Sequence, residues 1–363
     1  MYIVIAKIRR IVCGPITPSE VGKTLTHEHL SMTFMCTYRE EPAFLRKRVD
    51  FSNISFNLKD LHWIQQYPYC YKPNLLLNEC NEDIVDEISL FKLCGGSTIV
   101  DNTTHGIDPD LGFLYTISKN HGINIVSGCG YYVACAQSNS TLEMSIEDIA
   151  DSIRKKLTMG ESVETADGFQ NIKSGCIGEI GCSWPIHGCN FEKKSLQASA
   201  LVQSETNCPV IIHPGRDEKA PFEIMRIFQE AGGKADRTVM SHLDRTLISQ
   251  ESLSEFAKIG CYNEFDLFGI ETSYYLPNTK ISMPNDGERI KRIKYLIEEG
   301  YENKITISHD IHTKHRLMNY GGHGLSHIFL NVVNQMSELG MAQTSIDKIL
   351  IDNPKEWLTF NCK

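Results

Sequence analysis

Short runs rich in apolar and β-branched residues recur along the chain, and a polar or amphipathic stretch follows each of them. Three of the intervening segments, residues 81–96, 145–160 and 285–300, carry apolar residues at spacings of three and four and end in glycine, which predicts helices. The β-rich runs are eight in number: 23–30, 95–104, 122–132, 174–181, 208–215, 236–243, 259–267 and 304–312. Eight alternations of strand and helix favour an α/β fold of the (β/α)8 TIM-barrel type over a doubly wound sheet. No Gly-x-Gly-x-x-Gly motif opens the first helix, which further disfavours a dinucleotide-binding fold.

The first of these runs contains two histidines, His27 and His29, with one residue between them. Residues two apart point about 200° from each other on a helix, whereas they project from the same face of a strand. The threonines and apolar residues of KTLTHEHL indicate a strand that enters a loop, so both rings should face one point. The pair has two interpretations: two ligands of one metal, or two partly exposed histidines at a strand end.

Four more side chains that can bind metals lie at the carboxyl ends of other predicted strands. They are Glu179, His213, His242 and Asp310, on the fourth, fifth, sixth and eighth runs. A barrel brings these strand ends together on the face where TIM-barrel active sites are built. Any single buried histidine is more often a satisfied core residue than a ligand. Four histidines and two carboxylates with the same placement favour one shared metal site.

The chemistry of this set narrows the choice of metal. Imidazole nitrogens and carboxylate oxygens without a thiolate suit Zn²⁺, Mn²⁺, Fe²⁺ or Co²⁺ better than Ca²⁺. Six side chains exceed the three or four that one catalytic zinc uses, so we expect two divalent cations per chain, with Zn²⁺ as the first candidate. Glu179 would bridge them, with a shared water or hydroxide as the second bridge and a separation of about 3.5–4 Å.

The thirteen cysteines do not alter this picture. They are scattered, odd in number and placed in apolar, strand-like contexts, so reduced thiols fit better than a disulfide framework. No Cys-x-x-Cys pair occurs, which argues against a thiolate metal cluster.

Composition and charge indicate an ordinary globular chain. Its 363 residues, 41% hydrophobic and 22% charged, are enough for one large barrel or two medium domains, and we expect a single metal-dependent hydrolase domain over residues 1–363. The net charge of −9, with both signs interspersed, argues against nucleic-acid binding. The opening MYIVIAKIRRIV is too short and too charged for a secretory signal or a membrane span, and no later apolar run approaches about 20 residues. We therefore expect a cytoplasmic protein.

Residues 33–75 form the largest insertion, between the first strand and the first clear helix. The segment is rich in aromatic residues and in charges of both signs. It is either a partly ordered lid over the mouth of the barrel or a partner-binding face.

The motifs resemble those of the phosphotriesterase family of the amidohydrolase superfamily, and most closely its animal-type branch, the phosphotriesterase-related proteins. GKTLTHEHL resembles the N-terminal signature of the family, and TIVDNTTHGIDPD, VIIHPGR, MSHLDR, SHDIHTK and IDNPKEWL follow in the expected order over nearly the whole chain. The resemblance implies ligands for two metals: His27, His29 and Asp310 for the more buried one, His213 and His242 for the more exposed one, and Glu179 as the bridge.

The sequence departs from the bacterial phosphotriesterases in two places. Those enzymes bridge their metals with a carboxylated lysine on strand four, where this chain has Glu179, as the animal-type relatives do. They also carry a strand-seven histidine in a proton shuttle with a strand-six aspartate. Here NEFDLFG contains no histidine, although Asp244 is kept after strand six. These departures disfavour efficient organophosphate hydrolysis.

The expected reaction is hydrolysis by a hydroxide that bridges the two metals. A metal lowers the pKa of bound water from about 15.7 toward about 7, and the resulting hydroxide would attack a carbonyl. Asp310 would accept the proton and pass it to the leaving group; in the alternative interpretation it is a structural ligand alone. The resemblance implies an amidase that cleaves N-acetyltaurine and related N-acyl amino acids to acetate and free amine.

Other function classes stay open. Metal-activated hydroxide also permits a lactonase or a phosphoesterase on the same site. A non-catalytic metal-binding scaffold is less favoured, because all six ligand positions are filled. Whichever of these reactions the enzyme catalyses, we expect its binding partner to be a small-molecule substrate. The sequence also permits a homodimer.

Several neighbouring residues have two readings each. Arg216, three residues after His213, either clamps an anion such as a sulfonate or forms a surface salt bridge. Tyr131 and Tyr132 end the third predicted strand and either contact substrate in the pocket or pack its rim.

Three further polar residues are expected to serve the structure. His312 and His315 follow the eighth predicted strand and are more often loop histidines than ligands. Glu28 lies between the two strand-one histidines and should point away from them, toward the helices.

Overall fold

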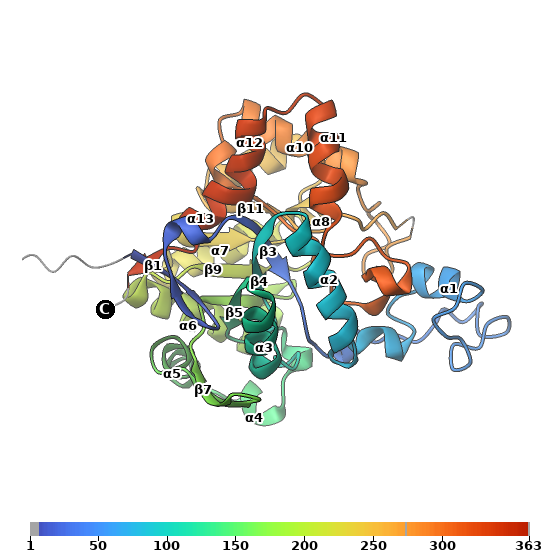
Figure 1. Ribbon diagram of the computed structural model, residues 1–363, viewed down its shortest axis with the longest axis horizontal. Coiled ribbons are helices and arrows are strands. Elements are labelled where there is room, and N and C mark those ends of the chain that lie inside the picture. The colour runs from blue at the N-terminus through green and yellow to red at the C-terminus, as the bar shows by residue number, and fades with distance from the viewer. Residues whose placement is uncertain (1–6, 273, 362–363) are drawn as a thin grey trace, which may run out of the picture.

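The computed structural model describes residues 7–272 and 274–361, and a sheet of eight parallel strands lies at its centre (Figure 1). In chain order the strands are β3 (Lys23–Glu28), β4 (Gly96–Asp101), β5 (Asn124–Cys129), β8 (Cys176–Gly181), β9 (Val210–His213), β10 (Thr238–Met240), β11 (Tyr262–Phe265) and β12 (Ile305–Ile307). The first and last strands meet where the amide of Asp310 donates to the carbonyl of His27 at 3.0 Å and Thr26 Oγ1 donates to the carbonyl of Ile307 at 3.3 Å. The predicted TIM barrel is confirmed.

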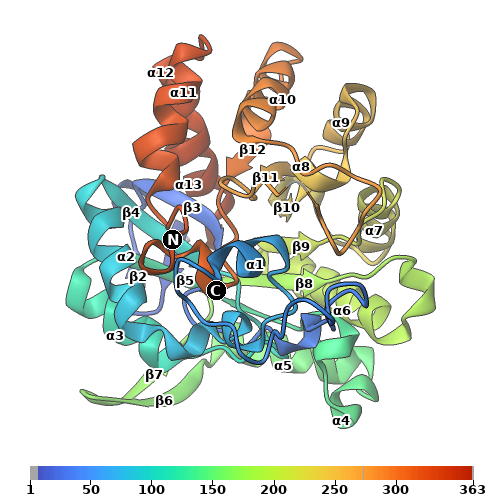
Figure 2. The ribbon, with the colours of Figure 1, turned by 90° about the vertical axis from the view of Figure 1, so that its right-hand side faces the viewer.

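Helices surround the barrel on its outside or lie in the segments over its mouth (Figure 2). They are α1 (Leu61–Gln66), α2 (Asn81–Leu93), α3 (Leu111–His121), α4 (Asn139–Leu142), α5 (Ile146–Thr158), α6 (Asn190–Thr206), α7 (Ala220–Glu230), α8 (Leu243–Thr246), α9 (Gln250–Ala257), α10 (Asp286–Glu298), α11 (Val333–Glu338), α12 (Gln343–Asp347) and α13 (Asn353–Trp357). The three predicted helices are confirmed as α2, α5 and α10. Local sequence explains the starts of α5 and α10, since Ser145 and Asn285 accept hydrogen bonds from the amides of Asp148 and Glu288.

The apolar core has two parts that follow the alternation of the strands. One cluster joins Val100, Val126, Ile211 and Val239, each from a different strand, with Trp357. The residues next to them in sequence belong to a larger cluster that also contains the buried faces of the helices. Successive strand residues therefore point inward and outward, and the inward set at the carboxyl end is free to carry polar chemistry.

Two smaller antiparallel sheets lie outside the barrel. The antiparallel strands β1 (Lys7–Ile11), β2 (Gly14–Ile16) and β13 (Phe360–Asn361) lie at one end (Figure 1). The hairpin of β6 (Glu161–Thr165) and β7 (Gly168–Ile172) lies beside α5. Across residues 7–272 and 274–361, no helix combines the length and the apolar character needed to span a bilayer.

The insertion at residues 33–75 lies at the opposite end from β1 and contains α1 (Figure 1). Its base is tied by a β-bridge between Thr33 and Leu76. The segment has an apolar cluster of its own, formed by Leu45, Phe51, Ile54, Ile64, Tyr67, Cys70 and Tyr71. It is therefore an ordered structure that packs over the carboxyl ends of the barrel strands.

Candidate metal centre

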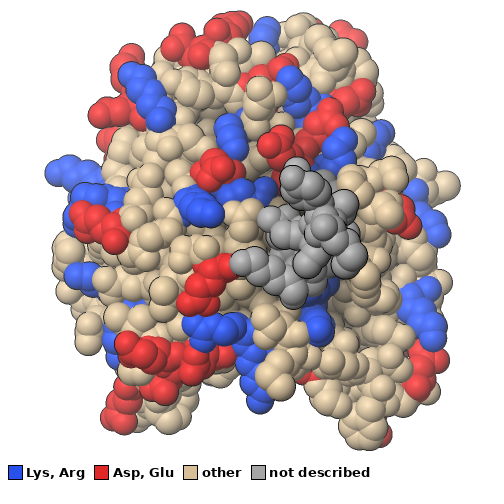
Figure 3. Space-filling view, turned by 90° about the vertical axis from the view of Figure 1, so that its left-hand side faces the viewer, with Lys and Arg blue, Asp and Glu red and all other residues tan. Residues whose placement is uncertain are grey.

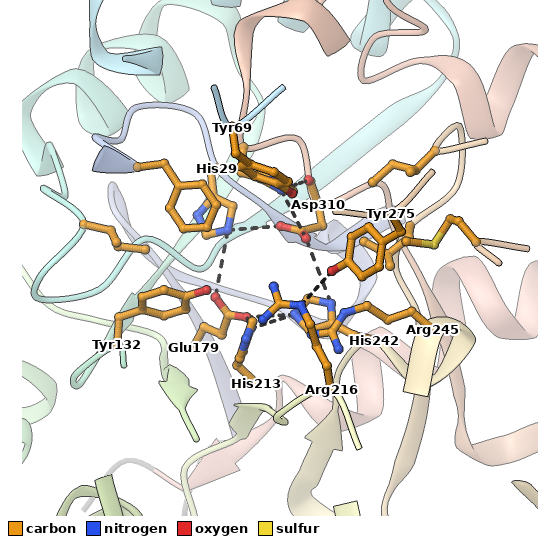
Figure 4. Close-up of a pocket in the computed structure, with 16 residues that line it drawn as sticks. His29, Tyr69, Tyr132, Glu179, His213, Arg216, His242, Arg245, Tyr275 and Asp310 are labelled. Carbon is orange, nitrogen blue, oxygen red and sulfur yellow. Dashed lines mark hydrogen bonds and ion pairs between the residues drawn. The ribbon is translucent and has the colours of Figure 1, made fainter. Parts of the chain in front are cut away.

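All six predicted ligands lie together at the carboxyl ends of the strands, and each is buried. Their positions are His27 in β3, His29 just after it, Glu179 in β8, His213 at the end of β9, His242 two residues after β10 and Asp310 three residues after β12. Figure 4 shows five of them, His29, Glu179, His213, His242 and Asp310. His242 and Asp310 have backbone φ values of 56° and 52°. Residues other than glycine adopt this left-handed conformation rarely, and such strain is concentrated at functional sites.

Glu179 stands between two pairs of histidines. Its Oε1 atom lies 2.6 Å from His213 Nδ1, 3.1 Å from His242 Nε2 and 3.5 Å from His27 Nε2. Its Oε2 atom lies 4.0 Å from His29 Nε2. Burial favours the neutral acid, but the charges of His213 and His27 and two hydrogen bonds hold the pKa of Glu179 well below its usual value. A carboxylate placed in this way can share one cation with each pair.

Asp310 approaches the strand-one pair from the other side. Its Oδ1 atom lies 3.3 Å from His29 Nε2 and 3.8 Å from His27 Nε2, while Oδ2 lies 3.3 Å from His312 Nδ1. Burial opposes ionisation, but the charge of His312 and hydrogen bonds from His29 and His312 hold the pKa of Asp310 well below its usual value. Asp310 is therefore an ionised carboxylate that can accept a proton.

Hydrogen bonds behind the site orient three of the four imidazoles. His29 Nδ1 lies 3.0 Å from Thr103 Oγ1, and His242 Nδ1 lies 2.8 Å from Asp266 Oδ1. His27 Nδ1 lies 3.1 Å from Asp266 Oδ2 and 3.2 Å from Glu264 Oε2. Each bond holds one ring nitrogen and turns the other toward Glu179 or Asp310, which is the arrangement that metal-binding histidines adopt.

These supporting acids were missed in the sequence, although a signal was present. Glu264 and Asp266 are two residues apart on the seventh predicted strand, so they share one face of it. Both are fully buried. Two buried carboxylates on the inward face of a strand require cationic or hydrogen-bonding partners, and His27 and His242 are those partners.

The residues fit a divalent cation. Within the described chain, His27 Nε2 is buried and has no hydrogen-bond partner, although its other nitrogen is held. A buried polar atom of this kind is costly unless a ligand satisfies it. The ligand atoms of His27, His29 and Glu179 lie within 4.8 Å of one another, as do those of Glu179, His213 and His242. Two adjacent sets of nitrogen and oxygen donors that share a carboxylate are suited to two cations.

Comparison with known proteins agrees with this geometry. The model of the Phosphotriesterase family matches residues 9–358. The chain belongs to the phosphotriesterase family. It is 50% identical over 349 residues to a Xenopus tropicalis protein and 49% identical over the same length to a human one, covering 96% of this chain and 97% of each relative. Both relatives are named N-acetyltaurine hydrolase.

A solved structure resembles the whole fold. The resiniferatoxin-binding protein from Rhodobacter sphaeroides is 28% identical, with a TM-score of 0.88, and the match covers 97% of this chain and 94% of that protein. The phosphotriesterase family is metal-dependent, and the two groups of histidines around Glu179 are the candidate ligands in this member.

Asp244 does not take part in the site of this phosphotriesterase-family chain. Its Oδ2 atom accepts hydrogen bonds from Arg289 Nε at 2.8 Å and from the amide of Leu267 at 3.1 Å. Arg289 is itself fully buried and also pairs with Asp286 at 2.7 Å. Asp244 is thus part of a buried ion pair and is not among the residues that line the pocket.

Glu28 serves the structure, as the sequence indicated. Its carboxylate accepts hydrogen bonds from Ser308 Oγ at 2.7 Å and from the amides of His309 and Ile311 at 2.8 and 3.1 Å. These donors flank Asp310 on both sides. Glu28 therefore fixes the turn that carries Asp310.

The walls of the pocket come from segments that lie far apart in the sequence. Phe34 and Tyr69 of the insertion line it together with Tyr132, Arg216 and Tyr275 (Figure 4). The ring of Tyr132 lies 5.2 Å from that of His213.

Tyr131 points away from this pocket. Its ring packs against Phe191 and His105, at centroid distances of 5.9 and 5.1 Å. Adjacent residues at the end of a strand face opposite sides, and the structure assigns the pocket side to Tyr132. Of the two readings of Tyr131, packing at the rim is the one that its position supports.

The two loop histidines have different surroundings. His312 lines the pocket, and its Nε2 atom lies 3.1 Å from the hydroxyl of Tyr69. His315 is held outside the pocket by Asn74, whose Oδ1 accepts the amide of His315 at 2.8 Å. His312 thus links the insertion to the turn that carries Asp310.

Proposed function

We propose that this chain hydrolyses the amide bond of N-acetyltaurine and related N-acyl amino acids, releasing acetate and the free amine. The observation that carries the proposal is near 50% identity to N-acetyltaurine hydrolases over almost the whole chain. It is joined by metal-spaced groups that contain five of the candidate ligands, His27, His29, Glu179, His213 and His242, and by Asp310, which lies 3.3 Å from His29 Nε2. A lactonase or phosphoesterase would use the same groups and is the second candidate.

We propose two divalent cations per chain, with Zn²⁺ first and Mn²⁺, Co²⁺ or Fe²⁺ as alternatives. His27, His29 and Asp310 would hold one, and His213 and His242 the other, with Glu179 between them. When bound, such cations polarise a carbonyl and lower the pKa of water at neutral pH. The donor set of imidazoles and carboxylates without thiolate supports this choice.

Within the pocket we propose that Asp310 accepts the proton of the attacking water on its carboxylate and delivers it to the leaving amine. Its position among the candidate ligands, with Oδ1 3.3 Å from His29 Nε2, supports this role. Tyr132, which lines the same pocket, would border the acetyl group. Arg216 would bind the sulfonate of the substrate through its guanidinium.

The pocket also bears on the domain organisation of the chain and on the role of residues 33–75. We propose one hydrolase domain over residues 1–363, in which residues 33–75 act as a lid. Phe34 and Tyr69 support the lid reading, because both insertion residues line the pocket. A homodimer and a cytoplasmic location stay predictions from sequence.

A direct assay tests the proposed reaction. Protein loaded with Zn²⁺, Mn²⁺ or Co²⁺ is expected to release acetate from N-acetyltaurine, measured against the same protein treated with a chelator. Lactone opening and phosphoester cleavage would be measured in parallel. Turnover of a lactone or phosphoester without acetate release under any metal would replace the amidase with the second candidate.

Replacing Arg216 with alanine is expected to raise KM for N-acetyltaurine with little change in kcat. A charge-assisted hydrogen bond formed equally in ground and transition states contributes about 1.5–3 kcal/mol, so KM should rise about 10- to 150-fold. Arg226→Ala is the matched control, because Arg226 lies on the exposed surface of α7 and pairs only with Glu223 and Glu230 among the described residues. An unchanged KM in Arg216→Ala would remove Arg216 from the substrate site.

A further inference from the structure

Two arginines beside the metal centre lack acidic partners. Among the residues that the structure describes, no carboxylate lies within 4 Å of Arg216 or Arg245, whereas the buried Arg289 pairs with Asp244 and Asp286. Arg245 is 3% exposed, and its guanidinium reaches only Thr246 Oγ1 at 3.2 Å and the carbonyl of Pro214 at 3.3 Å. Burying a guanidinium without a counter-charge is costly, so this pocket is built to receive an anion.

Tyr275 contacts Arg216 and lines the same pocket as Arg245. Its hydroxyl accepts a hydrogen bond from Arg216 Nε at 2.7 Å, and the Arg216 guanidinium lies 5.9 Å from the centre of its ring. Burial opposes ionisation of Tyr275, but the charges of Arg216 and Arg245 lower its pKa. All three side chains line the same pocket as Glu179 and Asp310 (Figure 4).

We propose that Arg216, Arg245 and Tyr275 form one anion subsite that selects a sulfonate over a carboxylate. The inference rests on the proposed function, since it adds Arg245 and Tyr275 to the site of the same reaction. A carboxylate has two coplanar oxygens, which the fork of a single guanidinium can satisfy. A sulfonate has three oxygens arranged around sulfur, and the third requires donors from another direction. A second guanidinium and a phenol hydroxyl supply them.

In this anion subsite Arg245 determines specificity, a role that the sequence analysis did not assign to it. It sits in α8, three residues after the candidate ligand His242. Its two contacts to protein are at the long end of hydrogen-bonding distance, so the guanidinium retains donors for a ligand. If Arg245 had only a structural role, its replacement would lower kcat/KM equally for all substrates.

Three acetamides that differ only at the end remote from the amide test the proposal. They are N-acetyltaurine, N-acetyl-β-alanine, which replaces the sulfonate with a carboxylate, and the neutral N-ethylacetamide. Wild-type protein is expected to show its highest kcat/KM on the sulfonate. Arg245→Gln should lower kcat/KM for N-acetyltaurine by about 10- to 100-fold through KM, with a smaller loss on the carboxylate and the least on the neutral amide. Tyr275→Phe should lower kcat/KM in the same order of substrates, sulfonate most and neutral amide least, but by a smaller factor.

Controls separate recognition from folding. Arg226→Gln on the surface of α7 should match the wild type on all three substrates, and metal content and thermal midpoint should be retained in Arg245→Gln. Equal losses of Arg245→Gln on the three substrates would overturn the proposal. So would a wild-type enzyme that does not distinguish the sulfonate from the carboxylate.

Ligand binding without turnover keeps this test independent of the proposed reaction. Calorimetric titration of metal-loaded protein with ethanesulfonate is expected to show binding that weakens at least tenfold in Arg245→Gln, and weaker binding of propanoate. If no acetamide is hydrolysed but this pattern is seen, the anion subsite stands and the amidase fails. If N-acetyltaurine is hydrolysed and both proteins bind ethanesulfonate equally, the amidase stands and the subsite is wrong.

Discussion

Asp310→Asn is expected to abolish turnover of N-acetyltaurine while the protein keeps at least one metal. Asparagine has nearly the same shape and can still offer an oxygen to a cation, but its amide cannot accept a proton. General-base catalysis commonly contributes about 10²- to 10⁴-fold, so kcat should fall by that factor or below detection. Because Asp310 is held by the turn that Glu28 clamps, the substitution should leave the geometry of that turn intact.

Acetate release and metal content measured on the same samples check this expectation. Asp151→Asn is the control, because Asp151 is an exposed aspartate on α5 that pairs with Arg154. If Asp310→Asn retained a large part of wild-type kcat, Asp310 would be a structural ligand alone and another group would accept the proton.

Glu179→Gln is expected to cause the second large effect, the weakening of both metal sites together. The Glu179 carboxylate faces both histidine pairs, with His213 Nδ1 at 2.6 Å on one side and His27 Nε2 at 3.5 Å on the other. Glutamine keeps the volume of the side chain but removes its negative charge and turns one oxygen into a donor. Loss of a group that only supports a ligand costs about 10- to 100-fold in metal affinity, so loss of the bridge should cost at least as much at each site.

Metal bound per chain, measured after equilibration with a graded series of chelator concentrations, tests the bridge. The exposed Glu143→Gln variant serves as the control for the loss of one surface charge. Release of one metal with the other at unchanged affinity would make Glu179 a ligand of a single site. Two metals at unchanged affinity would exclude Glu179 from the centre.

The sequence alone was enough to predict the barrel and the convergence of the candidate ligands at the carboxyl ends of its strands. Each of the eight apolar runs became a strand of the barrel, because alternation within a short run reports burial on one or both faces whatever the tertiary context. Parallel strands connected through helices must all end on one face. For that reason His213 in β9 and Glu179 in β8, 34 residues apart, could be placed together from their positions at strand ends.

What the sequence could not decide is how side chains from different strands and loops pair. Asp266 and Asp244 both follow strands, yet Asp266 holds His242 and His27 while Asp244 is neutralised by Arg289. Local periodicity predicts on which face of a strand a side chain lies. Which side chain of another element it contacts is set by barrel closure and by the register between strands. Arg289, on α10, reaches Asp244 only because α10 packs against that side of the barrel.

The pocket wall depends even more on the tertiary structure. Tyr131 and Tyr132 are equivalent in sequence, and the course of the chain after β5 sends only Tyr132 toward His213. Tyr275 and Arg216 are 59 residues apart, on loops without a repeating pattern, and meet at 2.7 Å. Periodicity and strand ends therefore determined the fold and the place of the candidate metal ligands, whereas the folding of loops over the barrel mouth decided the walls of the pocket. Loop contacts arise from packing and leave no regular trace in the sequence.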